Sequence, residues 1–198
     1  MPLTKERFDS GLTYQQYKEQ MTRNRERFDE VEKQIKVTPE QIAAFQKLSK
    51  PLNVLVIAED WCGDVIANVP ILGKLADESG KLNVRVFLRD QNDDLTQQWL
   101  NKGEFKSIPV FVFFDEQFNE LGHFIERPES VTNARAEKRK EVFAAHPEFG
   151  DPSAPPDKLP EDVRAKLTEA LTAMRDELTP FANAEVVKSL SQIVAKAA

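Results

Sequence analysis

The hydrophobic pattern changes period repeatedly between residues 38 and 145, and this constrains the fold more than any other feature. Residues 54–58 (VLVIA) form a continuous apolar run rich in β-branched side chains, which is typical of a strand buried on both faces. Residues 65–79 return to helical spacing, and residues 83–88 form a second apolar run. A strand–helix–strand unit needs a crossover connection, so the first two strands should be parallel.

The rest of this region completes a small sheet. We expect a short helix over residues 93–102, strands over 109–114 and 119–125, and a helix over 130–145. Only a turn at residues 115–117 separates the last two strands, so they should pair as an antiparallel hairpin. The chain is therefore predicted to have an α/β fold, with a four-stranded mixed sheet flanked by helices.

The N-terminal part is predicted to be a helical extension of residues 1–37. Apolar residues at spacings of three, four and seven predict one helix over residues 14–36. A new helix begins after Thr38, where the threonine can cap the helix and Pro39 suits its first position. This helix opens the predicted central domain, residues 38–145.

Beyond residue 145 the composition changes. Prolines and a glycine mark residues 146–160 as a semi-rigid linker. Two amphipathic helices separated by Pro180 follow, and we expect residues 161–198 to form a helical hairpin. Its apolar stripes must be buried either on the sheet domain or against a second copy of the chain. The second arrangement would be a homodimer through the terminal helices.

Composition excludes several classes of function. The 198 residues carry 27 Lys and Arg against 33 Asp and Glu, and the net charge of −6 argues against a nucleic-acid partner. No apolar run approaches the ~20 residues that a membrane span needs, and the N-terminal residues do not resemble a secretory signal. A cytoplasmic location is therefore expected. One cysteine and two histidines exclude a disulfide framework and leave little for a metal site, so no metal or other cofactor is predicted.

The segment between the first strand and the next helix carries the candidate site. Ligands bind at this carboxyl edge in open α/β sheets. Residues 58–72 (AEDWCGDVIANVPIL) resemble the active-site segment of thioredoxins, with Trp-Cys-Gly before a helix and Pro70 eight residues after the cysteine. Ser107-Ile108-Pro109 resembles the cis-proline loop of the same family. The resemblance covers roughly residues 10–145 and is closest to small bacterial thioredoxin-like proteins with a WCGD motif. It implies a thioredoxin fold with an extra N-terminal helix and a C-terminal helical extension.

The resemblance also implies roles for individual residues. Cys62 corresponds to the nucleophilic cysteine. The substrate-binding positions are Trp61, Gly63, Asp64, Ile108 and Pro109. The resemblance implies a cis bond before Pro109, which would let the Ile108 backbone pair with an extended peptide beside the cysteine.

The sequence departs from the thioredoxin pattern at three positions. Val65 stands where the resolving cysteine of a Cys-x-x-Cys motif would be. Val56 and Val86 occupy the positions of the buried acid and lysine that assist proton transfer in that family. A mixed disulfide needs a second thiol to resolve it, and valine cannot supply one. We therefore expect no efficient dithiol reduction by this chain alone.

The reactivity of Cys62 depends on opposing influences. The helix N-terminus stabilises a thiolate, whereas the charges of Glu59, Asp60 and Asp64 oppose it. These influences predict a moderately reactive thiol. The alternative is a buried cysteine that acts as a small hydrophobe, and Asp60 and Asp64 are expected to be mainly solvated charges.

Three hypotheses remain from the sequence. In the first, Cys62 exchanges with a protein or small-molecule thiol or disulfide, and an external thiol replaces the missing resolving cysteine. In the second, the chain is a non-catalytic binding or adaptor protein that uses the groove formed by Trp61, Cys62 and Pro109. In the third, Val65 replaces a cysteine of the parent protein through engineering or recent mutation.

Overall fold

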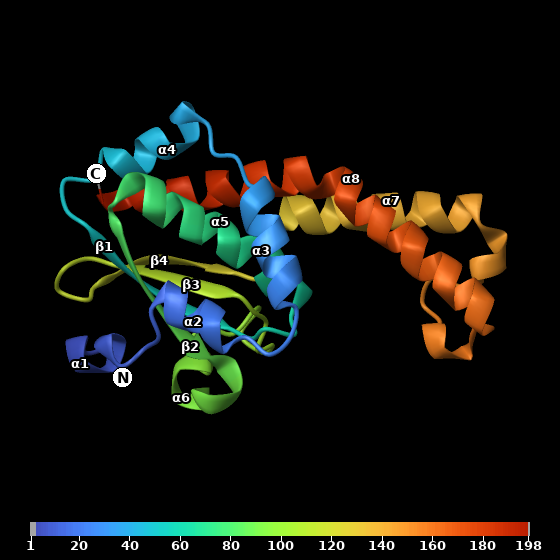
Figure 1. The fold of residues 1–198 in the computed structure, drawn as a ribbon, viewed down its shortest axis with the longest axis horizontal. Helices are drawn as coiled ribbons and strands as arrows, with labels where there is room; N and C mark the ends of the chain where they lie inside the picture. Colours follow the sequence, from blue (N-terminus) through green and yellow to red (C-terminus); the bar gives the residue numbers. More distant parts are fainter. Residues whose placement is uncertain (1–2, 198) are drawn as a thin grey trace. The chain divides into compact units, whose positions relative to one another are not determined.

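A computed structural model describes residues 3–197, and its central feature is a four-stranded mixed sheet with the strand order β2-β1-β3-β4 (Figure 1). The α-helices and strands, in chain order, are α1 (Lys5–Asp9), α2 (Tyr14–Gln20), α3 (Arg25–Gln34), α4 (Pro39–Gln46), β1 (Leu52–Ala58), α5 (Gly63–Ser79), β2 (Leu82–Leu88), α6 (Asp93–Thr96), β3 (Val110–Phe114), β4 (Glu120–Ile125), α7 (Glu129–Ala145) and α8 (Glu161–Val194). Short 3₁₀ helices η1 (Arg89–Gln91), η2 (Pro147–Phe149), η3 (Pro156–Lys158) and η4 (Ala195–Ala197) complete the set. The predicted α/β fold with a mixed sheet is confirmed.

Both predicted strand pairings are confirmed: β1 pairs in parallel with β2, and β3 pairs antiparallel with β4. In addition, β1 pairs antiparallel with β3, which the sequence pattern did not predict. β1 and β3 lie in the middle of the sheet, and nearly all of their residues are buried, as their continuous apolar runs require. Val56 lies opposite Val86 in the β1–β2 register, and both are fully buried. Apolar packing thus fills the place where thioredoxins carry a buried charge pair.

Helix α5 connects β1 to β2 and carries the start of the candidate site. Cys62 is its N-cap residue, and Gly80, with a φ of 62°, ends it in the left-handed conformation that glycine adopts most readily. Helices α3 and α4 pack against α5. The helix remains continuous through Pro70.

The N-terminal extension differs from the prediction. Residues 14–36 do not form one helix, because α2 ends at Gln20 and α3 begins only at Arg25. Between them, the backbone N–H groups of Thr22 and Arg23 donate to the Asp60 carboxylate at 2.8 and 2.9 Å. These two N–H groups are therefore not available for helical hydrogen bonds. The spacing of apolar residues carries no information about this contact with Asp60.

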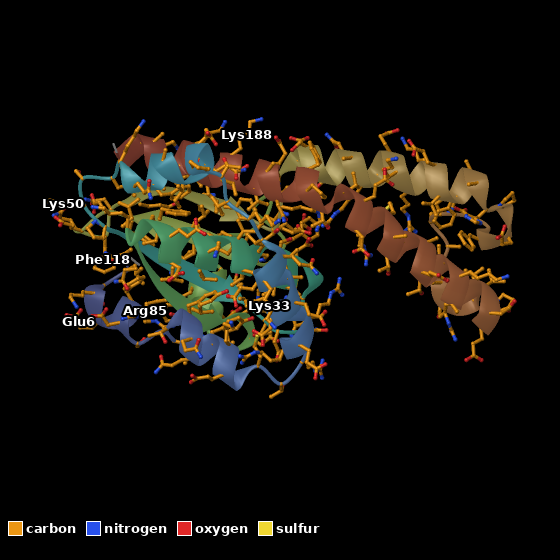
Figure 2. All side chains as sticks on the ribbon, turned by 45° about the horizontal axis from the view of Figure 1, so that its top comes forward. Glu6, Lys33, Lys50, Arg85, Phe118 and Lys188 are labelled. Atoms are coloured by element: carbon orange, nitrogen blue, oxygen red, sulfur yellow. The ribbon has the colours of Figure 1, made fainter. Side chains whose placement is uncertain are left out.

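Residues before α2 cover the edge of the sheet. Leu12 exchanges two backbone hydrogen bonds with Val86 of the edge strand β2, at 2.9 and 2.7 Å. The Phe8 ring of α1 packs against Phe118 with a centroid distance of 5.4 Å, and the Arg85 guanidinium lies 5.9 Å from the centre of the Phe8 ring. Arg85 and Phe118 are labelled in Figure 2. The N-terminal segment thus occupies part of an edge that would otherwise be open to pairing with another chain.

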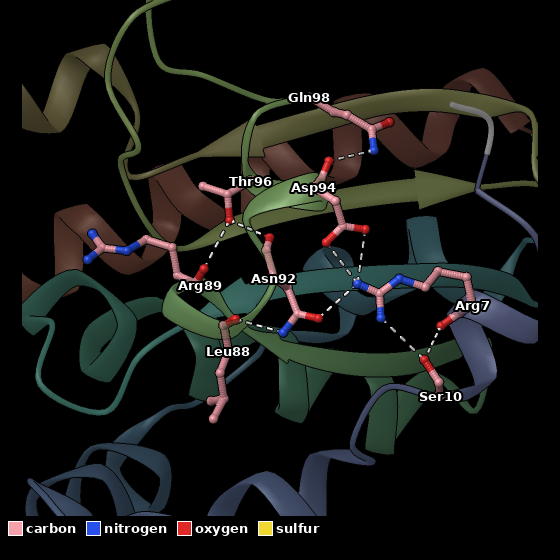
Figure 3. A network of polar contacts seen from close by, with 8 residues as sticks. All are labelled: Arg7, Ser10, Leu88, Arg89, Asn92, Asp94, Thr96 and Gln98. Carbon is pink, nitrogen blue, oxygen red and sulfur yellow. Dashed lines mark hydrogen bonds and ion pairs between the residues drawn. The ribbon is translucent and has the colours of Figure 1, made fainter.

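A polar network ties α1 to the segment that follows β2 (Figure 3). Arg7 donates to Asn92 at 2.8 Å and to both carboxylate oxygens of Asp94 at 3.0 and 3.1 Å. Asn92 in turn donates to the Leu88 carbonyl, and the Thr96 hydroxyl donates to the carbonyls of Arg89 and Asn92. This network fixes the turn that carries Arg89.

Helix α6 in this turn ends at Thr96, so the predicted helix over residues 93–102 is too long at its C-terminal end.

The prediction of a helical hairpin at the C-terminus is wrong. Residues 161–194 form the single helix α8, with Pro180 inside it. A proline removes one N–H donor and can bend a helix, but the hydrogen bonds on either side of it can hold the helix together.

The chain divides into two compact units. The main unit joins residues up to 127 with those from 186 onward, and the second unit is Pro128–Glu185. The apolar stripe at the end of α8 belongs to the core of the main unit, so the chain itself covers it; its members are Val186, Val187, Leu190, Ile193 and Val194. The second unit has a small core around Phe143, Phe149 and Leu167.

None of the described helices is long and apolar enough to cross a membrane.

Candidate functional site

Cys62 lies at the N-terminus of α5, facing the loop before β3. Its sulfur is half-buried, and the thiol donates a hydrogen bond to the Ile108 carbonyl at an Sγ–O distance of 3.5 Å. The Ile108–Pro109 peptide bond is cis, as the resemblance to thioredoxins implied. The two segments singled out in the sequence are therefore in direct contact, although 46 positions separate Cys62 from Ile108.

The environment of the sulfur raises the pKa of Cys62 above the ordinary value of a cysteine. Burial is the largest cause. Backbone hydrogen bonds from Val65 and Asp64 at the start of α5 lower the pKa, and the negative charges of Asp64 and Glu126 raise it. The expectation of a moderately reactive thiol rests on the helix end and the acidic neighbours and leaves out the loss of hydration. That loss makes the thiol less ionised at neutral pH than expected.

Trp61 forms an exposed surface beside the cysteine. It is 41% exposed, and the Arg89 guanidinium lies over its ring at 4.7 Å from the ring centre. Arg89 also donates to the Lys106 carbonyl at 3.4 Å, two residues before Ile108. Arg89 could not be selected from the sequence, because the contact requires the turn after β2 to reach the start of α5. Nearby lies a shallow pocket of about 370 Å³ lined by Arg89, Asp90, Asp93 and Lys106.

Gly63 and Val65 both lie in the first turn of α5, but their surroundings differ. A Cβ at Gly63 would meet no atom within 4 Å, so the space beside this residue is open. Val65, at the position of the resolving cysteine in thioredoxins, is fully buried. A side chain at position 65 therefore points into the core from the first turn of α5.

Comparison with known proteins gives the family. The family model described as thioredoxin matches residues 11–139, which is more than half of the chain. The chain belongs to the thioredoxin family. A search of curated proteins found no match.

Solved structures show the same fold. An HIV epitope-scaffold protein is 19% identical, with a TM-score of 0.63 and coverage of 96% of both chains. A protein of unknown function from Pseudomonas aeruginosa is also 19% identical, with a TM-score of 0.60; the match covers 86% of this chain and 95% of that one. At this identity the likeness concerns the fold alone. It extends beyond the residues that the family model matches.

Asp60 has a structural contact that its place in the sequence does not indicate. It was expected to be a solvated charge, but its carboxylate accepts the hydrogen bonds from Thr22 and Arg23. Its backbone carbonyl also accepts from the Asn24 side chain at 2.8 Å. Asp60 therefore holds the α2–α3 connection against the turn that presents Trp61 and Cys62.

Asp64 is not simply solvated either. Its carboxylate forms an ion pair with Arg127, just after β4, and Arg127 also pairs with Glu126 at 2.7 Å. The side chains of all three are largely buried. The sequence carries no signal for the contacts of Arg127 or Glu126. No spacing rule connects either residue to Asp64.

Tyr17 on α2 lies behind the site. Its ring is fully buried, and within the described residues its hydroxyl has no hydrogen-bond partner. Burial raises the pKa of Tyr17, and the charges of Asp60, Glu59 and Cys62 raise it further. The tyrosine is therefore neutral and adds no negative charge near the thiol.

Residues 3–197 contain no cluster of three or more His, Cys, Asp or Glu side chains that could hold a metal ion.

Proposed function

We propose that this thioredoxin-family protein carries out thiol–disulfide exchange through the single thiol of Cys62, with an external thiol completing the cycle. The observation that carries the proposal is the position of the sulfur. It lies at the start of α5, half-buried, 3.5 Å from the carbonyl of the residue before the cis-proline. Backbone N–H groups at a helix start stabilise the thiolate, which is the nucleophile.

The proposed cycle has two exchanges. The Cys62 thiolate attacks one sulfur of a substrate disulfide, so that a Cys62 mixed disulfide forms and the other half of the substrate leaves as a thiolate. An external thiolate then attacks the half of the mixed disulfide that came from the substrate. This step forms a new external disulfide and returns the Cys62 thiolate. The electrons come from the external thiol.

An external thiol is required because Val65 carries no sulfur and so cannot attack a mixed disulfide. The partners of the proposed reaction are therefore a protein or small-molecule disulfide and a separate thiol. The Ile108 backbone and the exposed ring of Trp61 are the surfaces against which we expect an extended substrate to lie.

The reaction can be tested with a peptide that carries glutathione in a mixed disulfide, with reduced glutathione as the external thiol. We expect the protein to accelerate release of the free peptide, and the Cys62→Ser variant to have no effect above background. Equal rates with the two proteins would contradict the proposal.

A second candidate function is peptide binding without turnover. It is favoured by the raised pKa of Cys62 and by the buried Val56 and Val86, which stand at the positions of the acid and lysine that assist proton transfer in thioredoxins. A peptide that binds equally well to wild type and Cys62→Ser, together with the absence of catalysed release, would support this alternative.

A further inference from the structure

A three-residue ion cluster lies against the first turn of α5. Arg127 pairs through one terminal nitrogen with Asp64 and through the other with Glu126 at 2.7 Å. Its Nε is buried and has no acceptor within the described residues. The guanidinium is therefore held by two carboxylates.

Backbone contacts fix this cluster close to the thiol. Asp64 is two residues after Cys62, in the first turn of the same helix. The Glu126 N–H donates to the Pro109 carbonyl at 2.7 Å, and the Glu126 carbonyl accepts from the buried Asn68 side chain of α5 at 2.8 Å. Glu126 thus bridges the cis-proline loop and α5, the two segments that enclose the sulfur.

The remaining contacts of Glu126 show that it is held in place. Its second carboxylate oxygen accepts from Asn101 at 2.9 Å. Its backbone has a φ of 62°, a conformation that a non-glycine residue adopts only when its surroundings hold it there. The carboxylate therefore cannot easily turn away from the site if its cationic partner is lost.

The charges around the sulfur come from several elements. Asp64 belongs to α5, Glu126 and Arg127 follow β4, and neutral Tyr17 comes from α2. Asp60 lies in the turn before Cys62 and is held by the α2–α3 connection. Arg127 is thus the cation that directly pairs the two carboxylates whose charges act on the thiol.

We propose that Arg127 is a positioning residue for exchange at Cys62, acting by holding the Asp64 and Glu126 carboxylates in ion pairs so that their negative charge suppresses the thiolate less than it would without the guanidinium. This role rests on the proposed function, because thiol–disulfide exchange is the reaction that uses the Cys62 thiolate. Two mostly buried carboxylates without their cation would disfavour a nearby anion.

The test is the pH profile of Cys62 alkylation by iodoacetamide, with the thermal unfolding midpoint measured for each variant. We expect the profile of Arg127→Gln to move up by roughly one pH unit, so that alkylation at pH 7 is about tenfold slower. Arg127→Lys retains the charge and should keep most of the wild-type profile. A profile of Arg127→Gln equal to that of wild type, in a folded protein, would overturn the proposal.

A second variant covers the case in which Arg127→Gln does not fold. Asp64→Asn removes one of the charges that oppose the thiolate, so its profile should move down in pH. In the double variant Asp64→Asn/Arg127→Gln the profile should lie closer to wild type than in Arg127→Gln alone. An Asp64→Asn profile that stays in place or moves up would overturn the proposal.

Alkylation does not require disulfide exchange, so the two proposals fail separately. Shifted alkylation profiles without catalysed release of glutathionylated peptide would reject the exchange function and leave the effect of Arg127 on the thiol intact. Catalysed release with unshifted profiles would reject only the role of Arg127.

Discussion

At the scale of single residues, Cys62 experiences opposing effects. The helix start and its N–H groups favour the thiolate, whereas burial and two carboxylates favour the thiol. The hydrogen bond from the thiol to the Ile108 carbonyl is available only to the protonated form. The folded protein therefore retains the proton on this sulfur to a higher pH than an unfolded chain does.

This balance gives a prediction for pH dependence. Because folding raises the pKa of Cys62, the alkylation rate of the native protein should reach its midpoint at a higher pH than that of the same protein in denaturant. Native alkylation at neutral pH should accordingly be slower. A native midpoint at or below the denatured one would contradict the assignment of burial as the largest cause.

Position 65 gives a prediction of gained activity. Val65→Cys places a second sulfur in the first turn of α5, three residues after Cys62, where it can resolve a mixed disulfide. We expect insulin reduction with dithiothreitol to rise from background to a measurable rate. The Cys62→Ser/Val65→Cys variant is the control and should remain at background. No gain in a folded Val65→Cys protein would favour the binding alternative.

At the scale of elements, the break between α2 and α3 depends on a contact outside both helices. The Asp60 carboxylate accepts two backbone N–H groups from the connection and one hydroxyl, that of Thr22. Apolar spacing alone predicts that the helix continues through these residues. A partner 38 residues away in the sequence decides the outcome.

We expect Asp60→Ala to destabilise the protein by about 1–2 kcal/mol, because the hydrogen bonds to a charged acceptor are lost. Urea unfolding measures this. Asp77→Ala, at an exposed position of α5, is the matched control and should change stability by less than about 0.5 kcal/mol. Equal effects of the two variants would show that Asp60 does not hold the connection.

At the scale of the whole molecule, the chain returns to its own core at the C-terminus. The last part of α8 lies in the main unit, and Leu190 is fully buried there. The fold is therefore completed by residues far from the sheet in the sequence.

Truncating Leu190 tests this closure. Leu190→Ala should cost about 2–5 kcal/mol, because it leaves a cavity in the core. Gln192→Ala, at an exposed position of the same helix, should have almost no effect on the urea midpoint. Similar midpoints for the two variants would contradict the burial of this end of α8.

Much of the fold followed from local pattern and from the resemblance to thioredoxins. The buried runs predicted β1 and β3, and the Trp-Cys-Gly segment and the Ile108–Pro109 loop predicted the contact at the sulfur. The pairing of Arg127 with Asp64 could not be predicted, since it joins residues 63 positions apart. Pro180 misled the prediction because a local rule says where a helix is weakened but not whether the helix ends there.

The most direct test of the central claim is intact-mass spectrometry of the protein after incubation with oxidised glutathione at a pH where alkylation shows Cys62 to be ionised. We expect a single glutathione adduct on Cys62 that a second thiol removes. An ionised Cys62 that forms no adduct would contradict the central claim, and so would an adduct that added thiol does not release.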